Sequence, residues 1–494
     1  MPTLAILQKT DLAILDDPRL FREFSYIDGA WTAGSSNRFI DVCDPADGSR
    51  VGSVPALTAG DTDRAVAAAH RAFSGWAAKL PQQRSAILRR WFELIVAARE
   101  DLARLMVQEQ GKPLSEARGE IDYAASFVEY YAEEAKRLNV ESVTPHLANA
   151  DMAVLRQPVG VAALVTPWNF PSAMVTRKAA AALAAGCTVV AHPSSQTPFS
   201  ALALAELAER AGIPAGVFNV VTGDAPEVVG ALTASRLVRV VSFTGSTEVG
   251  RLLYAQSAPT IKRLVMELGG HAPFIAFADC DLERAVDRAI AAKFATSGQD
   301  CLAANRFHIE RPIYRRFVDL FAERAKALTV GPGMDDRDIG PLMNEGAIAK
   351  QAAHVADALT RGARLICGGK VHPAGPLFFE PTVLADVPED AAVFSEETFG
   401  PIAAFAPFDR EDEAIERANR TETGLVAYLH SSDPVRIARM ERALEFGMIA
   451  VNRTKITGAP VPFGGVKQAG LGREGSRHGM EAFTEIKYIC RDIG

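Results

Sequence analysis

Cys301 is the residue of this sequence whose surroundings most strongly suggest chemistry. It lies in the segment SGQDCLAANR, between a Gly-Gln-Asp turn and a stretch of small residues. A buried cysteine usually fills apolar space, whereas a cysteine at a polar, glycine-containing turn is more often reactive. The segment therefore makes Cys301 a candidate nucleophile, with apolar filling as the alternative.

Two polar residues at predicted strand ends could assist such a thiol. Glu267, in VMELGG, precedes two glycines where the backbone can bend, and Asn169, in TPWNFP, offers an uncharged side-chain donor. Together they predict an aldehyde oxidation, in which Cys301 attacks the carbonyl carbon, Asn169 and a backbone N–H hold the oxyanion, and hydride leaves for a nicotinamide. Glu267 would then activate water against the thioester. A paired acid and a turn residue are the alternatives, because spacing along the chain does not establish proximity.

The elements that would position these residues follow alternating patterns. Residues 61–140 read as successive amphipathic helices, and from residue 160 short apolar runs alternate with helical ones. A second alternating section extends from about 262 to 440, and the tail beyond 475 alternates loosely, as an edge strand would. Such alternation predicts βαβ units with parallel sheets, whose ligands bind at the carboxyl ends of the strands. We therefore predict an α/β protein with two lobes and a cleft between them.

Two glycine-rich segments compete as the nucleotide-binding loop. The literal GxGxxG match, GLGREG at Gly470–Gly475, lies near the C-terminus and is followed by no strand–helix–strand unit, so we interpret it as a structural turn. In VVSFTGSTEVG, Gly245 allows a tight turn after an apolar run and Ser246 opens a helix. A helix N-terminus presents free N–H groups to a pyrophosphate. This segment is the better candidate, and a plain strand–helix turn is its alternative.

Overall composition excludes several classes of protein. The chain has 494 residues, enough for two or three domains, with 48% hydrophobic and 23% charged residues and a net charge of -7. We therefore expect no nucleic-acid partner, and no membrane partner because no apolar run approaches the roughly 18 residues of a membrane span. The N-terminus lacks the features of a signal peptide. Six scattered cysteines without a CxxC pair, and histidines without metal-ligand spacing, predict a cytoplasmic protein without a metal site.

Six segments, in their order and spacing, resemble those of the aldehyde dehydrogenase superfamily. They are TPWNFP, FTGSTEVG, MELGG, SGQDC, EETFGP and PFGGVKQAGLGREG, and the resemblance covers nearly the whole chain. Longer stretches such as NFPSAMVTRKAAAALAAGCTVV are most similar to the succinate-semialdehyde dehydrogenase branch. The resemblance implies NAD- or NADP-dependent oxidation of an aldehyde, such as succinate semialdehyde, to an acid through a cysteine thiohemiacetal and thioester.

The resemblance also implies roles for individual residues. Cys301 would be the nucleophile, Glu267 the general base and Asn169 the oxyanion donor. Residues of the cofactor site would be Trp168, His192, Ser195, Gly245, Ser246, Glu397 and Phe399. Residues of the substrate site would be Arg177, Thr457 and Phe463.

The architecture implied by the resemblance has three parts. A Rossmann-like cofactor-binding domain would comprise residues 1–124 and 148–261, and an α/β catalytic domain residues 262–474. A small β oligomerisation arm would comprise residues 125–147 and 475–494. The implied assembly is a homodimer or a homotetramer.

Departures from the family pattern affect cofactor and substrate. His192 stands where a lysine is usual, which weakens a phosphate contact, and Ser195 replaces an acid that would repel a 2′-phosphate, so NAD and NADP both stay open. Ala295 stands where the succinate-semialdehyde branch has a second arginine. Losing such a contact weakens carboxylate binding by roughly tenfold to a hundredfold, which favours a longer or less acidic aldehyde. Arg453 or Lys455 could supply a replacement charge.

Two rival functions deserve comparison with aldehyde oxidation to an acid. In a CoA-acylating dehydrogenase, CoA instead of water takes the acyl group, and such relatives generally lack the glutamate found here at Glu267. A non-catalytic binding or structural protein of the same family is the other rival. The joint presence of Cys301, Glu267 and Asn169 disfavours it.

Ala303 stands where some relatives have a second cysteine, so no resolving thiol lies two residues from Cys301.

Overall fold

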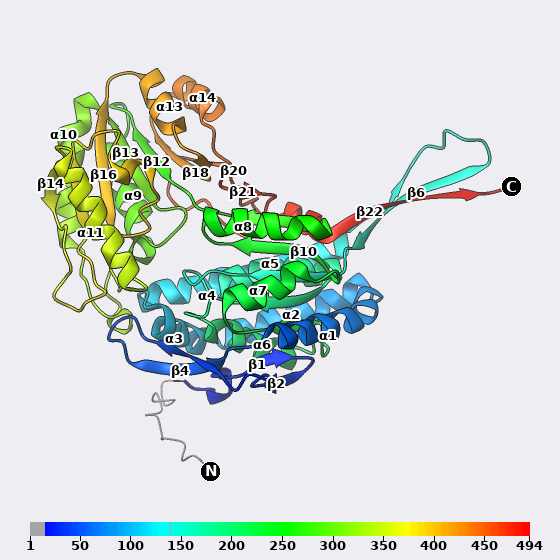
Figure 1. Ribbon diagram of the computed structural model, residues 1–494. Coiled ribbons are helices and arrows are strands. Elements are labelled where there is room, and N and C mark those ends of the chain that lie inside the picture. The colour runs from blue at the N-terminus through cyan, green and yellow to red at the C-terminus, as the bar shows by residue number, and fades with distance from the viewer. Residues whose placement is uncertain (1–14, 139) are drawn as a thin grey trace, which may run out of the picture.

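The computed structural model of the protein describes residues 15–138 and 140–494 (Figure 1). Residues 1–14, on which the expected lack of a signal peptide largely depends, lie outside the described residues. Among the described helices, none combines the length and the apolar character that crossing a membrane requires.

An eight-stranded sheet forms the first lobe. Its strand order is β2-β1-β9-β8-β7-β10-β11-β21, and neighbours from β9 to β11 run parallel. The strands are β1 (Ser25–Ile27), β2 (Ala30–Thr32), β7 (Val161–Val165), β8 (Thr188–His192), β9 (Phe218–Val220), β10 (Val238–Thr244), β11 (Arg263–Glu267) and β21 (Gly470–Leu471). The predicted alternation of strands and helices after residue 160 is confirmed.

Helices cover both faces of this sheet, which is why most residues of its parallel strands are buried. They are α1 (Ala59–Ala77), α2 (Pro81–Ala97), α3 (Arg99–Gln110), α4 (Leu114–Glu134), α5 (Ala173–Ala185), α6 (Phe199–Arg210), α7 (Ala225–Ala234) and α8 (Thr247–Ser257). Within β7, Ala162 and Leu164 join the core formed with α5 and α6, whereas Val161 and Ala163 join the core formed with α1 and α7. The two-residue period of a strand produces this division.

A seven-stranded sheet forms the second lobe, in the order β14-β15-β16-β13-β12-β18-β19, with only β14 antiparallel to its neighbour. Its strands are β12 (Ala272–Ala276), β13 (Ala304–Glu310), β14 (Arg364–Cys367), β15 (Thr382–Ala385), β16 (Ile402–Phe408), β18 (Val426–His430) and β19 (Met448–Val451). Its helices are α9 (Leu282–Phe294), α10 (Arg311–Ala327), α11 (Glu345–Thr360), α12 (Ala392–Ser395), α13 (Glu411–Asn419) and α14 (Pro434–Ala443). The stacked rings of Phe307 and Phe405, with centroids 4.6 Å apart, lie in its core.

One predicted boundary between the sections is wrong. The sequence places the start of the second section at residue 262, but β11 pairs in parallel with β10 in the first sheet, with Thr244 opposite Glu267. The second sheet therefore begins at β12. An apolar strand can pair with either sheet, and its flanking contacts decide which.

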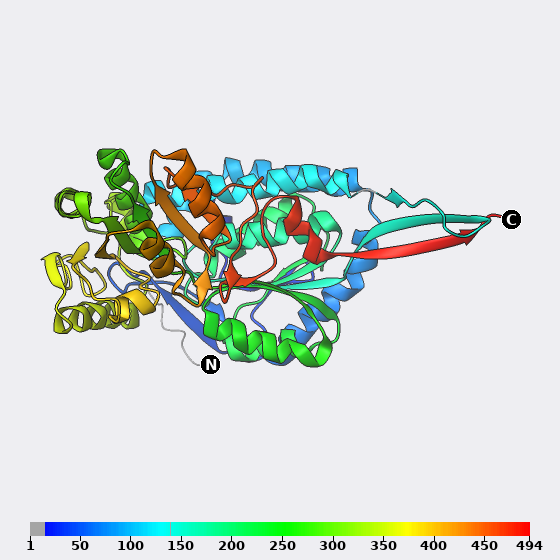
Figure 2. The ribbon, with the colours of Figure 1, turned by 90° about the horizontal axis from the view of Figure 1, so that it is seen from above.

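A three-stranded sheet projects from the body as an arm, with the C-terminus near its tip (Figures 1 and 2). It consists of β22 (Thr484–Asp492), β6 (Ala150–Pro158) and β5 (Glu141–Ser142), in that order. The expected arm bounds of 125–147 need correction, because residues 125–134 belong to α4, which packs against α2 and α5. Strand β6 supplies the middle of the arm instead. The division into three domains stays a prediction.

Several smaller elements complete the described chain. Two further sheets pair β3 (Phe39–Cys43) with β4 (Arg50–Pro55), and β17 (Thr423–Gly424) with β20 (Val466–Lys467). Short 3-10 helices are η2 (Pro18–Leu20), η3 (Ala135–Arg137), η4 (Ala258–Thr260), η5 (Ala295–Gly298), η6 (Gly333–Asp335) and η7 (Arg477–Phe483). Of these, η5 matters for function because it immediately precedes the segment with Cys301.

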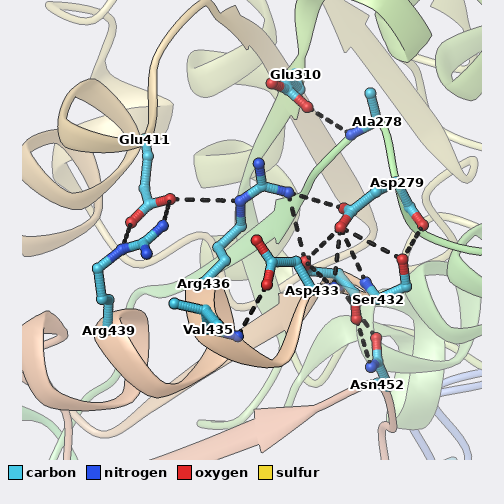
Figure 3. A network of polar contacts seen from close by, with 11 residues as sticks. Ala278, Asp279, Glu310, Glu411, Ser432, Asp433, Val435, Arg436, Arg439 and Asn452 are labelled. Atoms are coloured by element: carbon cyan, nitrogen blue, oxygen red, sulfur yellow. Dashed lines mark hydrogen bonds and ion pairs between the residues drawn. The ribbon is translucent and has the colours of Figure 1, made fainter.

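A polar network ties the turn after β12 to α13 and α14 (Figure 3). The Asp279 carboxylate accepts hydrogen bonds from Ser431 Oγ at 2.9 Å and the Asp433 N–H at 3.0 Å, and pairs with Arg436 at 3.0 Å. Arg436 also pairs with Glu411 of α13 at 3.3 Å. Although partial burial opposes it, the Ser431 bond and the Arg436 charge lower the pKa of Asp279. The network fixes the loops of the second lobe.

Candidate active site

A cavity of about 620 Å³ is lined by residues of both lobes. The first lobe contributes the loop after β7, one face of α5 and the end of β10, and the second contributes the Cys301 segment, α11 and the loops around 397 and 457. The carboxyl ends of β7 and β10 in the first sheet and the amino ends of β13 and β16 in the second sheet face this region, so the predicted cleft is present. Predicted site residues that line it are Asn169, Cys301, Trp168, Gly245, Ser246, Glu397, Phe399, Arg177, Thr457 and Phe463.

Cys301 follows η5, whose backbone is strained. Thr296 and Ser297 have φ values of 50° and 57°, in the left-handed region that non-glycine residues rarely adopt. Glu116 stabilises this turn by accepting hydrogen bonds from the N–H of Thr296 at 2.8 Å and from its hydroxyl at 3.2 Å. Desolvation, with the charges of Asp300 and Glu397, raises the pKa of the Cys301 thiol well above its usual value. The resting thiol is therefore protonated and needs a base before it can attack.

Asn169 lies beside the Cys301 segment. Its side-chain amide donates a hydrogen bond to the Gln299 carbonyl at 3.0 Å, and its side chain is buried. The backbone carbonyl of Asn169 accepts a hydrogen bond from Lys112 Nζ at 2.7 Å. Lys112 pairs with Glu120 at 2.5 Å, and Glu120 also accepts the Ser172 N–H at 2.9 Å. A fully buried ion pair thus holds the loop that carries the amide.

Glu267 is buried at the end of β11, but it is not among the residues that line the cavity. Its carboxylate lies close to Gly464, where an added Cβ would come within 2.9 Å of Oε1. Both carboxylate oxygens accept no hydrogen bond from the described residues. Burial and the nearby Glu474 charge raise the pKa of Glu267 well above its usual value, although Arg177 and Lys178 oppose this rise. An acid with a raised pKa and no fixed partner is suited to exchange protons.

Glu474 is the important residue that the sequence analysis missed. It pairs with Arg177 at 2.6 Å and forms a second ion pair with Lys178. Lys178 also donates to Thr244 Oγ1 at 2.7 Å, at the wall of the cavity. The residue falls within the rejected GLGREG match, so the only available signal was an acid in a glycine-rich loop. Its partners lie almost 300 residues earlier in the chain.

Arg177 lines the cavity from α5, as the sequence predicts for a substrate-binding residue. Its guanidinium lies 4.2 Å from the ring centroid of Phe463, which lines the same region. The Tyr123 hydroxyl lies near both Arg177 and Thr457; desolvation raises its pKa, and hydrogen bonding to the two residues opposes the rise. These residues form a wall that combines aromatic surface with one partly neutralised cation.

The other end of the cavity has the features of a nucleotide site. Ser246 caps the N-terminus of α8 by accepting a hydrogen bond from the Val249 N–H at 3.3 Å, and a Cβ at Gly245 would come within 2.4 Å of the Phe243 ring. Any side chain at position 245 would therefore require the Phe243 ring to move. Trp168 and Phe399 meet edge to face, with ring centroids 5.6 Å apart.

Glu397 stands at this same end. Its Oε1 accepts a hydrogen bond from the Gly270 N–H at 3.1 Å, which leaves its other oxygen available to a hydroxyl. Burial raises the pKa of Glu397 to about 7. The carboxylate is thus placed to accept a sugar hydroxyl.

His192 and Ser195 do not line the cavity. His192 is buried at the end of β8, and its Nδ1 donates a hydrogen bond to the Val221 carbonyl at 2.9 Å. Burial lowers the pKa of His192, so the ring is neutral. Ser195 lies on the partly exposed turn that follows β8. Their contacts with a cofactor stay a prediction.

Comparison with known proteins settles the family. The sequence model of the aldehyde dehydrogenase family matches residues 31–489 of the chain. The chain belongs to the aldehyde dehydrogenase family. It is 52% identical over 477 residues to the succinate-semialdehyde dehydrogenase [NADP(+)] GabD of Escherichia coli, covering 96% of this chain and 99% of that one.

Two further similarities support the same conclusion. A glutarate-semialdehyde dehydrogenase of Pseudomonas aeruginosa is 50% identical over 477 residues, which covers 96% of this chain and 99% of that one. The crystal structure of an E. coli NADP-dependent enzyme superposes with a TM-score of 0.96 at 52% identity, covering 97% of this chain and 100% of that one. The protein is therefore an oxidoreductase that acts on aldehydes with NAD(P), and it has the α/β aldehyde dehydrogenase fold with its Rossmann-like cofactor part and catalytic part.

The residues present fit a nicotinamide dinucleotide. A Cβ-excluding glycine and a capped helix N-terminus form one wall of the cavity, at Gly245 and Ser246, where a pyrophosphate is favoured. Glu397, which lines the same cavity, would offer a carboxylate oxygen to a ribose hydroxyl. When bound, the nicotinamide supplies the hydride acceptor of the reaction.

Proposed function

We propose that the enzyme oxidises a semialdehyde, an aldehyde with an anionic group at its other end, to the corresponding diacid. The observation that carries this proposal is that Cys301, Asn169 and Arg177 line one cavity. A thiol for the aldehyde carbon, an amide for its oxygen and a guanidinium for a distal carboxylate thus share one space. The relatives named for succinate and glutarate semialdehyde support the same substrate class.

The first half of the proposed mechanism makes a thioester. Cys301 gives its proton to a water molecule and its sulfur bonds to the aldehyde carbon, while the carbonyl oxygen becomes an oxyanion that accepts hydrogen bonds from the Asn169 amide and a backbone N–H. Collapse of this thiohemiacetal restores the carbonyl and expels hydride from the former aldehyde carbon, which a bound oxidised nicotinamide would accept. Lys112 and Glu120 contribute by keeping the Asn169 loop in place before the substrate arrives.

The second half releases the acid. Glu267 removes a proton from water, the hydroxide adds to the thioester carbon and the carbon–sulfur bond breaks. In the structure the Glu267 carboxylate faces Gly464 instead of the cavity, so the side chain must turn toward Cys301 for this step. The presence of Glu267 disfavours the CoA-acylating rival, since such an enzyme needs no base for hydrolysis.

Cofactor choice, assembly and location complete the proposal. NADP use is supported by the E. coli relative, whose name specifies it, and by the absence of an acid at Ser195. A homodimer or homotetramer is supported by the projecting arm, whose strand β22 is at an edge of its sheet. A cytoplasmic location is supported by six free cysteines. Steady-state kinetics with NAD and NADP test the first of these points.

Replacement of the nucleophile tests the reaction itself. The Cys301→Ala enzyme should lose at least about a thousandfold in kcat with every aldehyde, because the covalent route is removed. The rate is followed by the ultraviolet absorbance of the reduced nicotinamide, with succinate semialdehyde, glutarate semialdehyde and neutral aldehydes of matched length. Cys280→Ala is the control, because Cys280 does not line the cavity. Equal loss in both variants, or turnover in Cys301→Ala, would contradict the assignment.

A further inference from the structure

A second cavity, of about 770 Å³, adjoins the active-site cavity. The two share Gly119, Tyr123, Lys455 and Thr457, so these residues form the junction between them. Cys301 and Arg177 line only the inner cavity, whereas the outer one is lined by α4 and the loop 455–460. A substrate that reaches Cys301 through this junction passes Lys455.

The carboxylates of the outer cavity already have basic partners. The pairs are Asp122–Arg99 at 2.6 Å, Glu129–Arg89 at 2.8 Å, Glu133–Lys136 at 2.6 Å and Glu134–Arg137 at 2.6 Å. Because each carboxylate has a basic partner nearby, this wall does not repel an anionic substrate strongly. None of these four carboxylates forms an ion pair with Lys455.

Lys455 is the cation at the junction that has no partner. Its ammonium makes no ion pair or hydrogen bond with the described residues, and its side chain is exposed. The backbone around it is held, because Arg453 Nε donates to the Lys455 carbonyl at 2.9 Å and Thr454 Oγ1 donates to the Arg288 carbonyl at 3.1 Å. Arg453, the other candidate for a replacement charge, does not line either cavity.

The inner cavity offers less positive charge than its residue types suggest. Arg177 is paired with Glu474, which it shares with Lys178. Ala295 lines the cavity with an exposed methyl group and no charge. The third cation of the wall, Lys350, belongs to the end with Glu397, where its charge partly opposes the rise in the Glu397 pKa that burial causes. At the aldehyde end, Lys455 is therefore the uncompensated cation.

We propose that Lys455 binds the distal anionic group of the substrate and so selects semialdehydes with a longer chain than succinate semialdehyde. A short chain held at Cys301 leaves its carboxylate beside Arg177, whereas a longer chain extends it to the junction, where Lys455 can pair with it without displacing an acid. This inference rests on the proposed function and narrows it to a substrate length. It also assigns the specificity to a loop residue instead of to position 295.

Substitution of Lys455 tests this inference with succinate, glutarate and adipate semialdehydes and with neutral aldehydes of the same lengths. In Lys455→Ala, the ratio of kcat/KM for adipate semialdehyde to that for hexanal should fall about tenfold, because a charged hydrogen bond is lost. The change should appear in KM more than in kcat, since the contact is remote from the reacting atoms. Lys455→Arg should restore most of the ratio, and Lys455→Glu should lower it further.

Lys326→Ala is the matched control, because Lys326 is an exposed lysine on α10 that lines neither cavity. It should leave every ratio unchanged. The length preference of the wild type should also weaken as salt is added, because an exposed pair is screened. A wild-type preference for succinate semialdehyde, or equal effects of Lys455→Ala on acidic and neutral aldehydes, overturns the role of Lys455. Failure of the proposed function looks different, since the wild type would then oxidise no semialdehyde better than its neutral analogue.

Discussion

At the scale of single residues, the site contains two acids whose surroundings give them opposite protonation. Glu474, close to Arg177 and Lys178, has its pKa lowered by them despite desolvation and is ionised. Glu267 is buried beside that charge and has a raised pKa. Two acids with pKa values pushed apart are typical of a site that moves protons. Glu267 is the one whose raised pKa favours the protonated form.

Glu267→Gln should separate the two halves of the reaction. Reduced nicotinamide should still appear in a burst equal to the enzyme concentration, and later turnover should fall by roughly 10²–10⁴-fold, because water is no longer activated. The pKa of Glu267 is raised, so the wild-type steady rate should increase with pH across that raised pKa, where the base becomes charged. Stopped-flow traces and a pH–rate profile measure both effects. A steady rate in the variant equal to that of the wild type would remove Glu267 from the mechanism.

At the scale of elements, buried ion pairs hold the catalytic loops against helices. Lys112 follows α3 and Glu120 lies on α4, yet together they bind the Asn169 carbonyl and the first N–H groups of α5. The Asn169 amide in turn contacts the Gln299 carbonyl, two residues before Cys301. Three helices and two loops are thus connected by one pair of charges. The ion pair thus sets the position of the Asn169 amide, and a shift of about 1 Å in a group that positions the substrate can lower the rate by about a hundredfold.

Lys112→Met should therefore lower kcat by about tenfold to a hundredfold with little change in KM, because the oxyanion donor is misplaced while substrate binding is retained. Leaving Glu120 buried and unpaired should also cost about 3–5 kcal/mol of stability. The double variant Lys112→Met/Glu120→Gln removes that lone charge and should recover the unfolding midpoint without recovering kcat. If kcat returns together with stability, the pair is only structural.

At the scale of the whole molecule, the three-stranded arm of the described chain exposes apolar side chains to solvent. Strand β22 pairs with β6 on one side only, and its residues Ile486 and Tyr488 are 65% and 54% exposed. A long edge strand with apolar side chains tends to pair with another chain. This feature underlies the proposed homo-oligomer.

Tyr488→Lys should weaken that assembly, because a charge would replace an exposed aromatic side chain on one face of β22. Light scattering and sedimentation at several concentrations should show a smaller species than for the wild type. Lys487→Ala is the control, since Lys487 is exposed on the alternate face of the same strand. A wild type that stays monomeric at all concentrations would exclude a role of the arm in self-association.

The sequence by itself determined the alternating elements and the main positions of the site. Apolar runs of strand length between amphipathic helices specify βαβ units locally, because each pattern reflects which face of its own element is buried. For the same reason the strand-end segments with Asn169 and Gly245 could be located, whereas Cys301 was found from its polar, glycine-containing turn; the structure brings all three to one cavity.

Only the tertiary structure decided which of these residues meet and how their charges combine. Nothing local in β11 indicates that it pairs with β10, nor in α4 that residues 125–134 stay in the body. The turn of Glu267 toward Gly464, the burial of His192 against Val221 and the pairing of Glu474 with Arg177 likewise depend on segments far apart in the chain. Through-space desolvation and Coulomb interactions set protonation, and neither quantity is encoded in a local pattern.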